Sequence, residues 1–137
     1  MNRITTACAT ALSLLLVSLA VAQGTGGSIT GTITLASSVA NADHLRVFVC
    51  LEADKMCAKP VQTLLLKGNP GPKIAYAFND LKPGSYFVYA INDLNDNLMH
   101  DMDTEEFGAW AKPASFDPAF ITPPAKDINF EMTPITR

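Results

Sequence analysis

The chain has 137 residues and a formal net charge of −3 at pH 7. It is long enough for one domain with a hydrophobic core and too short for two domains with a cleft between them. Because acidic residues outnumber basic ones, the composition argues against a protein that grips nucleic-acid phosphates, and we expect no nucleic-acid partner.

Residues 1–22 have the three-part layout of a secretory signal peptide. Arg3 precedes a leucine-rich apolar run, and Ala20 and Ala22 supply the small residues of a cleavage site before Gln23. The run is short for a membrane span of ~20 residues, and no basic cluster follows it. We therefore expect cleavage, which places the mature protein in the periplasm or outside the cell, without a membrane span.

Two cysteines, Cys50 and Cys57, remain once Cys8 is removed with the signal peptide. Disulfides persist in exported proteins, and this spacing, with no further Cys or nearby His, suits neither zinc nor redox chemistry. A disulfide between Cys50 and Cys57 is therefore favoured over two buried thiols or a soft-metal pair.

Apolar residues at every second position predict a series of short strands between residues 28 and 132. A Gly-rich lead-in at 23–27 precedes this domain, and a tail at 133–137 follows it. The predicted strands cover 29–35, 45–51, 61–66, 74–78, 86–91 and 127–132, with a weaker pattern at 119–122. Turns rich in Gly, Pro and Asn separate several of them, and no segment shows the pattern of an amphipathic helix. The sequence thus predicts an all-β, antiparallel immunoglobulin-like or transthyretin-like β-sandwich of about seven strands.

The segment 93–106 holds six acidic residues and no Lys or Arg. It contains the pattern D-x-N-x-N-x-x-x-D, whose alternating oxygen-bearing side chains converge on one point in a tight loop. Hard cations such as Ca²⁺ take about six to eight oxygen ligands. By analogy with the EF-hand loop, the predicted ligands are the side chains of Asp93, Asn95, Asn97 and Asp101 and the carbonyl group of Met99.

Two positions depart from the EF-hand pattern. Leu98 stands where the sharp turn prefers Gly, and Thr104 stands where a bidentate Glu is expected, although Asp103 or Glu105 could substitute. One alternative is a metal-free loop stabilised by Asx turns, in which Asp and Asn side chains accept hydrogen bonds from nearby backbone. Another is a copper site, because thioether and imidazole ligands favour copper. Its ligands would be Met99, His100 and Met102.

The sequence offers little for enzymatic chemistry. Its only two histidines, His44 and His100, lie outside any nucleophile motif, and there is no phosphate-binding Gly loop with a Lys. The acidic residues crowd one predicted exposed loop instead of flanking a substrate cleft. We therefore expect no enzymatic activity. Four aromatic residues fit either a sugar-stacking platform or anchors that pin the loop to the core: Phe107, Trp110, Phe116 and Phe120.

Residues 78–86, F-N-D-L-K-P-G-S-Y, resemble the F-x-x-L-x-P-G-x-Y signature of transthyretin-like and collagen-adhesin B-type sandwiches. With the acidic segment directly after it, the chain more closely resembles a family of secreted bacterial domains of unknown function (domain of unknown function 2141), whose loop is D-x-N-x-N-G-x-x-D. Asp93, Asn95, Asn97 and Asp101 match that loop, and Leu98 replaces its Gly. The family's G-x-P-x-E-G-Y-G-F continuation is reduced here to residues 105–108. The resemblance implies an exported sandwich and brings no activity with it.

Together these patterns predict an exported, non-enzymatic β-sandwich that serves as a binding or structural module. Its acidic segment would either hold Ca²⁺ or stabilise itself, and its partner would be a protein or a component of the cell envelope. A periplasmic copper-handling protein is the alternative, and a small hydrolase is the least favoured function.

Overall fold

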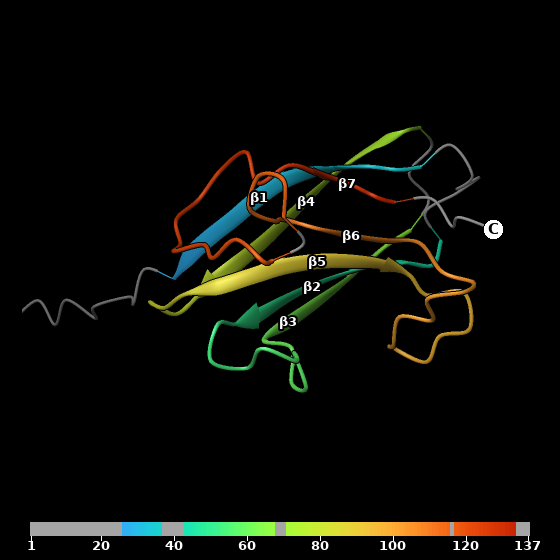
Figure 1. Cartoon of the computed structure of the whole chain (residues 1–137). Coiled ribbons are helices and arrows are strands. Elements are labelled where there is room, and N and C mark those ends of the chain that lie inside the picture. Colours follow the sequence, from blue (N-terminus) through green and yellow to red (C-terminus); the bar gives the residue numbers. More distant parts are fainter. Residues whose placement is uncertain (1–25, 37–42, 68–70, 116, 134–137) are drawn as a thin grey trace, which may run out of the picture.

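The computed structural model describes residues 26–36, 43–67, 71–115 and 117–133. These residues form seven strands in two sheets and no helix (Figure 1). The predicted all-β sandwich is therefore confirmed. The predicted signal peptide and cleavage site, most of the lead-in and residues 134–137 of the tail lie outside the described residues. Within the described part of the chain, no helix is long and apolar enough to cross a membrane.

The first sheet has the strand order β4-β1-β7. Strand β1 (Gly27–Thr34) pairs in antiparallel fashion with β4 (Lys73–Leu81) and in parallel with β7 (Phe130–Glu131). The parallel pair departs from the antiparallel arrangement that the sequence predicts. Strand β7 is also shorter than predicted, because only Phe130 and Glu131 hold register with β1, opposite Ile33 and Thr34.

The second sheet is antiparallel, with the order β3-β2-β5-β6. Its central strands are β2 (Leu45–Leu51) and β5 (Tyr86–Asn92), and its edges are β3 (Gln62–Leu66) and β6 (Phe107–Ala109). The sequence did not predict β6, since three residues are too few to show a period of two. Conversely, segment 119–122 is not a strand, because it contributes only the single bridge between Tyr86 and Ile121.

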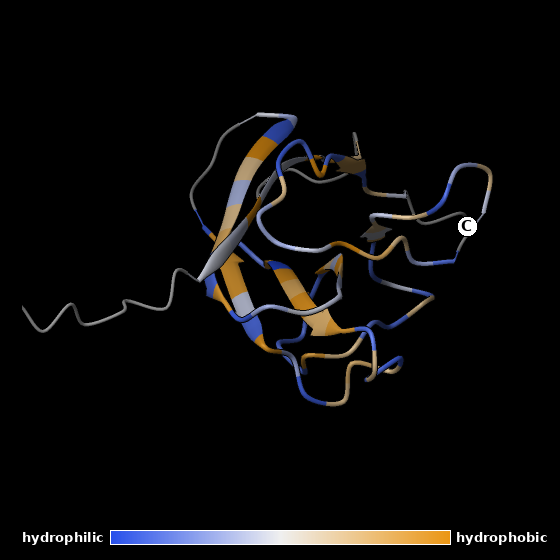
Figure 2. Cartoon of the chain, turned by 90° about the vertical axis from the view of Figure 1, so that its left-hand side faces the viewer, coloured by the Kyte–Doolittle hydropathy of each residue, from blue (hydrophilic) through white to orange (hydrophobic). Residues whose placement is uncertain are grey.

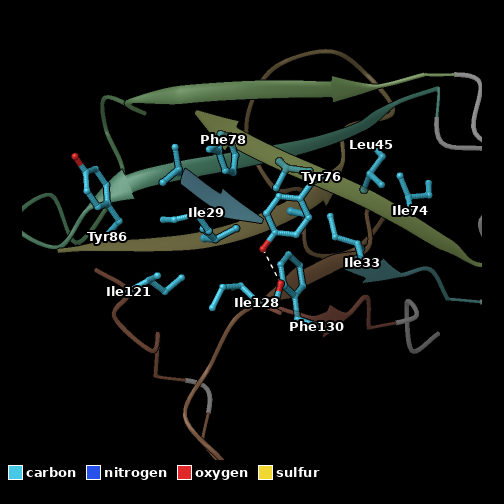
Figure 3. Close-up of a cluster of buried hydrophobic side chains, with 14 of the residues drawn as sticks. Ile29, Ile33, Leu45, Ile74, Tyr76, Phe78, Tyr86, Ile121, Ile128 and Phe130 are labelled. Carbon is cyan, nitrogen blue, oxygen red and sulfur yellow. Dashed lines mark hydrogen bonds between the residues drawn. The ribbon is translucent and has the colours of Figure 1, made fainter. Parts of the chain in front are cut away.

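The hydrophobic core lies between the two sheets. Figure 2 shows apolar and polar residues alternating along the strands, so each strand turns alternate side chains toward the facing sheet. Figure 3 shows the buried cluster that results. Each fully buried aliphatic or aromatic side chain contributes about 1.5–3 kcal/mol. Fully buried members of this cluster include Ile29, Ile33, Leu45, Val47, Val49 and Phe78.

A buried tyrosine anchors the C-terminal segment to the first sheet. The hydroxyl group of Tyr76 donates to the carbonyl group of Ile128 at 2.7 Å (Figure 3). That carbonyl group also lies so close to Gly31 that a Cβ atom there would overlap it. Glycine at position 31 therefore allows the segment before β7 to lie against β1.

The P-G-x-Y turn and the disulfide fix one end of the second sheet. The hydroxyl group of Tyr86 donates to the carbonyl group of Lys82 at 2.7 Å, which ties the start of β5 to the preceding turn. The predicted disulfide between Cys50 and Cys57 is confirmed, with Cα atoms 5.5 Å apart. It closes the turn after β2, where the carboxylate of Asp54 accepts hydrogen bonds from two backbone amides.

Candidate functional site

We call residues 93–106 the acidic loop; it connects β5 to β6 at the opposite end of β5 from the disulfide (Figure 1). The amide of Asp93 donates to the carbonyl group of His44, and the amide of Asn92 donates to the carbonyl group of Glu106, both at 3.0 Å. Both ends of the loop are therefore hydrogen-bonded to neighbouring chain at the sheet end.

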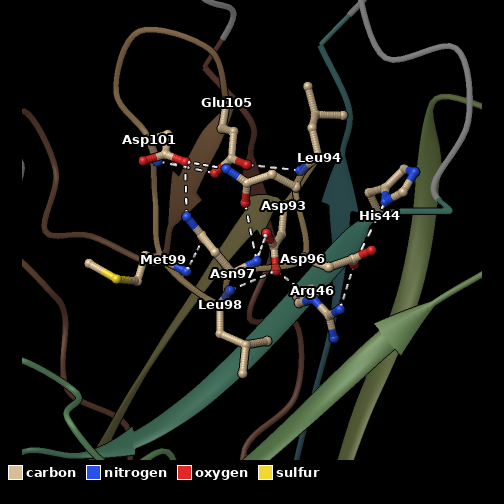
Figure 4. Close-up of polar contacts among 11 residues, drawn as sticks. His44, Arg46, Asp93, Leu94, Asp96, Asn97, Leu98, Met99, Asp101 and Glu105 are labelled. Carbon is tan, nitrogen blue, oxygen red and sulfur yellow. Dashed lines mark hydrogen bonds and ion pairs between the residues drawn. The ribbon is translucent and has the colours of Figure 1, made fainter.

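The carboxylate of Asp93 is fully buried and is satisfied by the protein itself. It accepts the Nε–H of Arg46 at 2.7 Å and the backbone amides of Asn97 and Leu98, each at 3.0 Å (Figure 4). Burial of a carboxylate is costly unless it is paired and hydrogen-bonded. Arg46, which projects from β2, is therefore the cation that allows Asp93 to lie inside the structure.

The same guanidinium reaches a second acid of the loop. Its Nη2 atom lies 2.7 Å from the Oδ1 atom of Asp96. The Nδ1 atom of His44 lies 3.8 Å from the same oxygen. The hydrogen bond from Arg46, together with the positive charge, lowers the pKa of Asp96 below its usual value of 3.8. Arg46 thus forms ion pairs with one buried and one exposed carboxylate.

Glu105 connects the two limbs of the acidic loop. Its side chain is 3% exposed, and its carboxylate accepts the amide of Leu94 at 2.8 Å and the amide of Asp101 at 3.1 Å. Glu106 is buried as well. The expectation that all acids of this segment crowd an exposed loop is therefore wrong, because Asp93, Glu105 and Glu106 lie inside, and the first two order the backbone.

Three of the predicted calcium ligands meet at one point. The Nδ2 atoms of Asn95 and Asn97 lie 2.7 Å and 3.1 Å from an oxygen of Asp101. Their Oδ1 atoms accept backbone amides two residues ahead, which makes both residues Asx turns. In this conformation the two amides turn N–H groups toward Asp101, and Asp93 faces Arg46 instead.

The fit to a cation site is therefore partial. Glu105 has both oxygens engaged with backbone amides, so along this loop path it does not take the place of the ligand missing at Thr104. Among the residues that the structure describes, no group of three or more His, Cys, Asp or Glu side chains is arranged to hold a metal ion.

Leu98 occupies a backbone conformation that favours glycine. Its φ angle is 63°, and that of Asp96 is 56°. Left-handed φ angles cost about 1–2 kcal/mol for residues with a Cβ atom. The acidic loop therefore makes a left-handed turn at Leu98, a position that glycine would occupy without this cost.

The three predicted copper ligands have separate surroundings. The Nε2 atom of His100 lies 3.0 Å from the carbonyl oxygen of Glu105, and its ring packs on Phe107 with centroids 5.1 Å apart. Met99 and Met102 are largely exposed. His100 thus holds the loop against the sheet, while the two methionines form part of the loop surface.

The aromatic residues that the sequence offers as a sugar-stacking platform or as anchors also differ in their surroundings. Phe107 stacks on Tyr89 with ring centroids 5.9 Å apart, and Trp110 packs against the main core. Phe120 is partly exposed, and Phe116 lies outside the described residues. Phe107 and Trp110 therefore act as anchors.

Sequence reasoning missed Arg46, His44 and the inward orientation of Glu105. Arg46 carried a usable signal, because it is the one charged residue in the otherwise apolar strand 45–51. A lone arginine in a central strand predicts a nearby acidic partner, since charges are seldom buried unpaired. The pattern does not say which acid that partner is.

Comparison of the chain with family models, with curated proteins and with solved structures finds no match. The resemblance to secreted domains of unknown function stays a prediction.

Proposed function

We propose that this protein is an exported, non-enzymatic binding module that presents its acidic loop to a protein or cell-envelope partner. One observation carries the proposal: buried carboxylates fix the loop backbone while large apolar side chains project from it. Preformed loops lose less conformational entropy on binding, and exposed apolar groups with a polar rim mark interaction surfaces. The projecting residues, with their exposed fractions, are Leu94 (52%), Leu98 (56%), Met99 (68%) and Met102 (82%).

The charge of the loop indicates the chemistry of its partner. Asp96 and Asp103 lie exposed among these apolar residues, and only Asp96 is paired with Arg46 in the described structure. Complementary charge at an interface steers association and sets specificity. The partner surface is therefore apolar with a basic rim.

Two features support export and a non-enzymatic role. The disulfide between Cys50 and Cys57 suits an oxidising compartment outside the cytoplasm. His44 and His100 both help to order the acidic loop, His44 through its carbonyl group and His100 through its ring. The imidazole group of His100 thus has a structural partner in this arrangement.

Photo-crosslinking tests the proposal. A photoreactive amino acid replaces Leu98 or Met102 in the loop, or Ala77 on the exposed face of the first sheet as the matched control. We expect one crosslinked species from the loop positions and none from position 77, and we expect unlabelled wild-type protein to compete. A variant with serine at positions 94, 98, 99 and 102 should not compete. Equal crosslinking from position 77, or none from the loop, contradicts the proposal.

A calcium ion is the second candidate ligand of the loop. It is supported by the convergence of Asn95 and Asn97 on Asp101. Turning the two side-chain amides over would exchange their N–H groups for oxygens at this point, and carboxylate and amide oxygens are the ligands that Ca²⁺ takes. Such a turn would give up both Asx-turn hydrogen bonds, so the expected affinity is weak.

A further inference from the structure

The outer face of the second sheet is aromatic. Phe48 stacks on Tyr89 with ring centroids 4.8 Å apart and an interplanar angle of 13°. Phe87 lies 6.3 Å and Phe107 lies 5.9 Å from the same tyrosine ring, again nearly parallel. The solvent-facing side of an antiparallel sheet is ordinarily polar. Here the ladder is part of a second buried cluster around the disulfide, in which Phe48 and Phe87 are buried and Tyr89 and Phe107 are half-buried.

Two adjoining hollows open over this ladder, between the disulfide turn and residues 112, 117, 118 and 120. One has a volume of about 210 Å³ and is bounded by Phe87, Tyr89 and Phe107. The other, of about 270 Å³, is bounded by Phe87 and Phe120, and both share Lys55 and Pro118. We call the pair the aromatic hollow. Concave apolar sites with a few polar groups are typical of small-molecule binding.

The polar groups around the aromatic hollow are two lysines, a tyrosine hydroxyl group and two neighbouring acids. Lys55 borders both parts and Lys112 borders the second, and neither forms an ion pair with any described residue. The hydroxyl group of Tyr89 likewise has no hydrogen-bond partner within the described ranges. Of the neighbouring acids, Asp54 is engaged with the amides of Ala58 and Lys59, and Asp117 borders the second part.

We propose that the aromatic hollow binds a small organic anion with a flat apolar body, such as an aromatic carboxylate. Stacking on Phe87 and Tyr89 would hold the flat body, because offset parallel rings attract one another. The ammonium groups of Lys55 and Lys112 would hold the carboxylate, and the hydroxyl group of Tyr89 would donate to it. The proposal does not rest on the acidic loop, although Phe107 bounds the hollow and also packs on His100 of that loop.

Calorimetric titration of the purified protein tests this proposal with three probes. 2-Naphthoate has both the ring and the charge, 2-naphthylmethanol has the ring alone, and acetate has the charge alone. We expect saturable binding of 2-naphthoate with a Kd of about 1 mM or tighter, binding of 2-naphthylmethanol about fivefold weaker, and none of acetate. Amide NMR shifts should change in β5, β6 and residues 54–57, and stay unchanged in residues 94–98 of the acidic loop.

Two double variants and one single variant test whether binding depends on the lysine charges and on the tyrosine hydroxyl group. The double variant Lys55→Gln, Lys112→Gln should bind 2-naphthoate about fivefold more weakly than the wild type does, and its affinity for 2-naphthylmethanol should be unchanged. The matched control is the double variant Lys73→Gln, Lys126→Gln, which removes the same charge elsewhere. Its affinity for both naphthyl probes should equal that of the wild type. Tyr89→Phe keeps the ring and removes the hydroxyl group, and should lower the affinity for 2-naphthoate by about threefold.

Three results would overturn the proposal. The first is no saturable binding of 2-naphthoate. The second is equal binding of the charged and uncharged probes that neither lysine variant changes, which would make the hollow a plain apolar patch. The third is self-association through this face, seen by sedimentation and abolished by Phe120→Ser, which would make a second copy of the chain its occupant.

Discussion

The Nε–H of Arg46 in β2 donates to the fully buried carboxylate of Asp93 at 2.7 Å, across 47 residues of sequence. The contact joins the central strand of the second sheet to the first residue of the acidic loop. Because Asp93 also accepts the amides of Asn97 and Leu98, the position of this one side chain sets the turn that follows. The loop is thus ordered by the protein's own groups.

Removing Arg46 should destabilise the protein strongly. Arg46→Met keeps most of the apolar stem and leaves a buried carboxylate without its cation, which should lower the free energy of unfolding by about 3 kcal/mol. Urea unfolding measures this loss. Lys126→Met, at an exposed position, should change stability by less than about 0.5 kcal/mol. Equal stability of the two variants would show that the ion pair contributes nothing.

Glycine at position 98 should stabilise the protein. Leu98 is exposed and has a φ angle of 63°, so Leu98→Gly removes a left-handed strain of about 1 kcal/mol. Leu94→Gly is the matched control, because Leu94 is a similarly exposed leucine of the same loop without a positive φ angle. That control should lose about 0.5–1 kcal/mol. Thermal unfolding shows whether each variant is more or less stable than the wild type. A Leu98→Gly variant that is less stable would contradict the assignment of strain to Leu98.

Acid should weaken the contact between Arg46 and Asp96. The pKa of Asp96 is lowered in the folded protein by the hydrogen bond from Arg46. A lowered folded-state pKa contributes stability above the unfolded-state value near 3.8, and that contribution is lost as pH falls through the folded-state value. Asp96→Asn should therefore flatten the fall of Tm between about pH 5 and pH 2. Asp103→Asn, at another exposed acid of the loop, should leave this part of the profile steeper than Asp96→Asn does.

The disulfide should stabilise the protein by the entropy of the short loop that it closes in the unfolded chain. Cys50 and Cys57 enclose a short turn, for which the chain-entropy relation gives about 2.5 kcal/mol. We expect the Cys50→Ala, Cys57→Ala variant to lose about this amount in urea unfolding. A reducing agent should destabilise the wild type and leave the variant unchanged. A variant as stable as the wild type would show that the bridge constrains nothing.

Metal titration distinguishes the ligands considered for the acidic loop. If Ca²⁺ binds where Asn95, Asn97 and Asp101 converge, calorimetry should give a saturable heat that Asp101→Ala abolishes and Asp103→Ala retains. A heat with Cu(I) that is lost in Met99→Ser with Met102→Ser would favour the copper site instead. No heat with either ion leaves a loop that is stabilised by its own hydrogen bonds.

The parts of the fold that depend on local alternation could be predicted from the sequence. Leu45–Leu51 and Tyr86–Asn92 have long apolar patterns, and both became central strands. The short turn between Cys50 and Cys57 made their disulfide predictable from spacing and compartment. Strand β6 was not predictable, because three residues show no period, and the parallel pairing of β7 depends on a partner far away in the chain.

The sequence predicted the position of the acidic loop after β5, but not the internal organisation of that loop. Asx turns follow from Asn and Asp at alternate positions, so that part was a local inference. Whether an acid points inward depends on a donor brought near by tertiary structure, as Arg46 is brought to Asp93. Composition therefore predicted an exposed acidic loop where the structure has one held together by buried acids.

Amide hydrogen exchange in the metal-free protein tests the central claim most directly, namely that the acidic loop is preformed by its own carboxylates. With a chelator present, the amides of Leu94, Asn97, Leu98 and Asp101 should exchange slowly, because each donates to Asp93 or Glu105. The amides of Met102 and Asp103, which have no acceptor among the described residues, should exchange fast. Fast exchange throughout the loop, with protection gained only when Ca²⁺ is added, would contradict the claim.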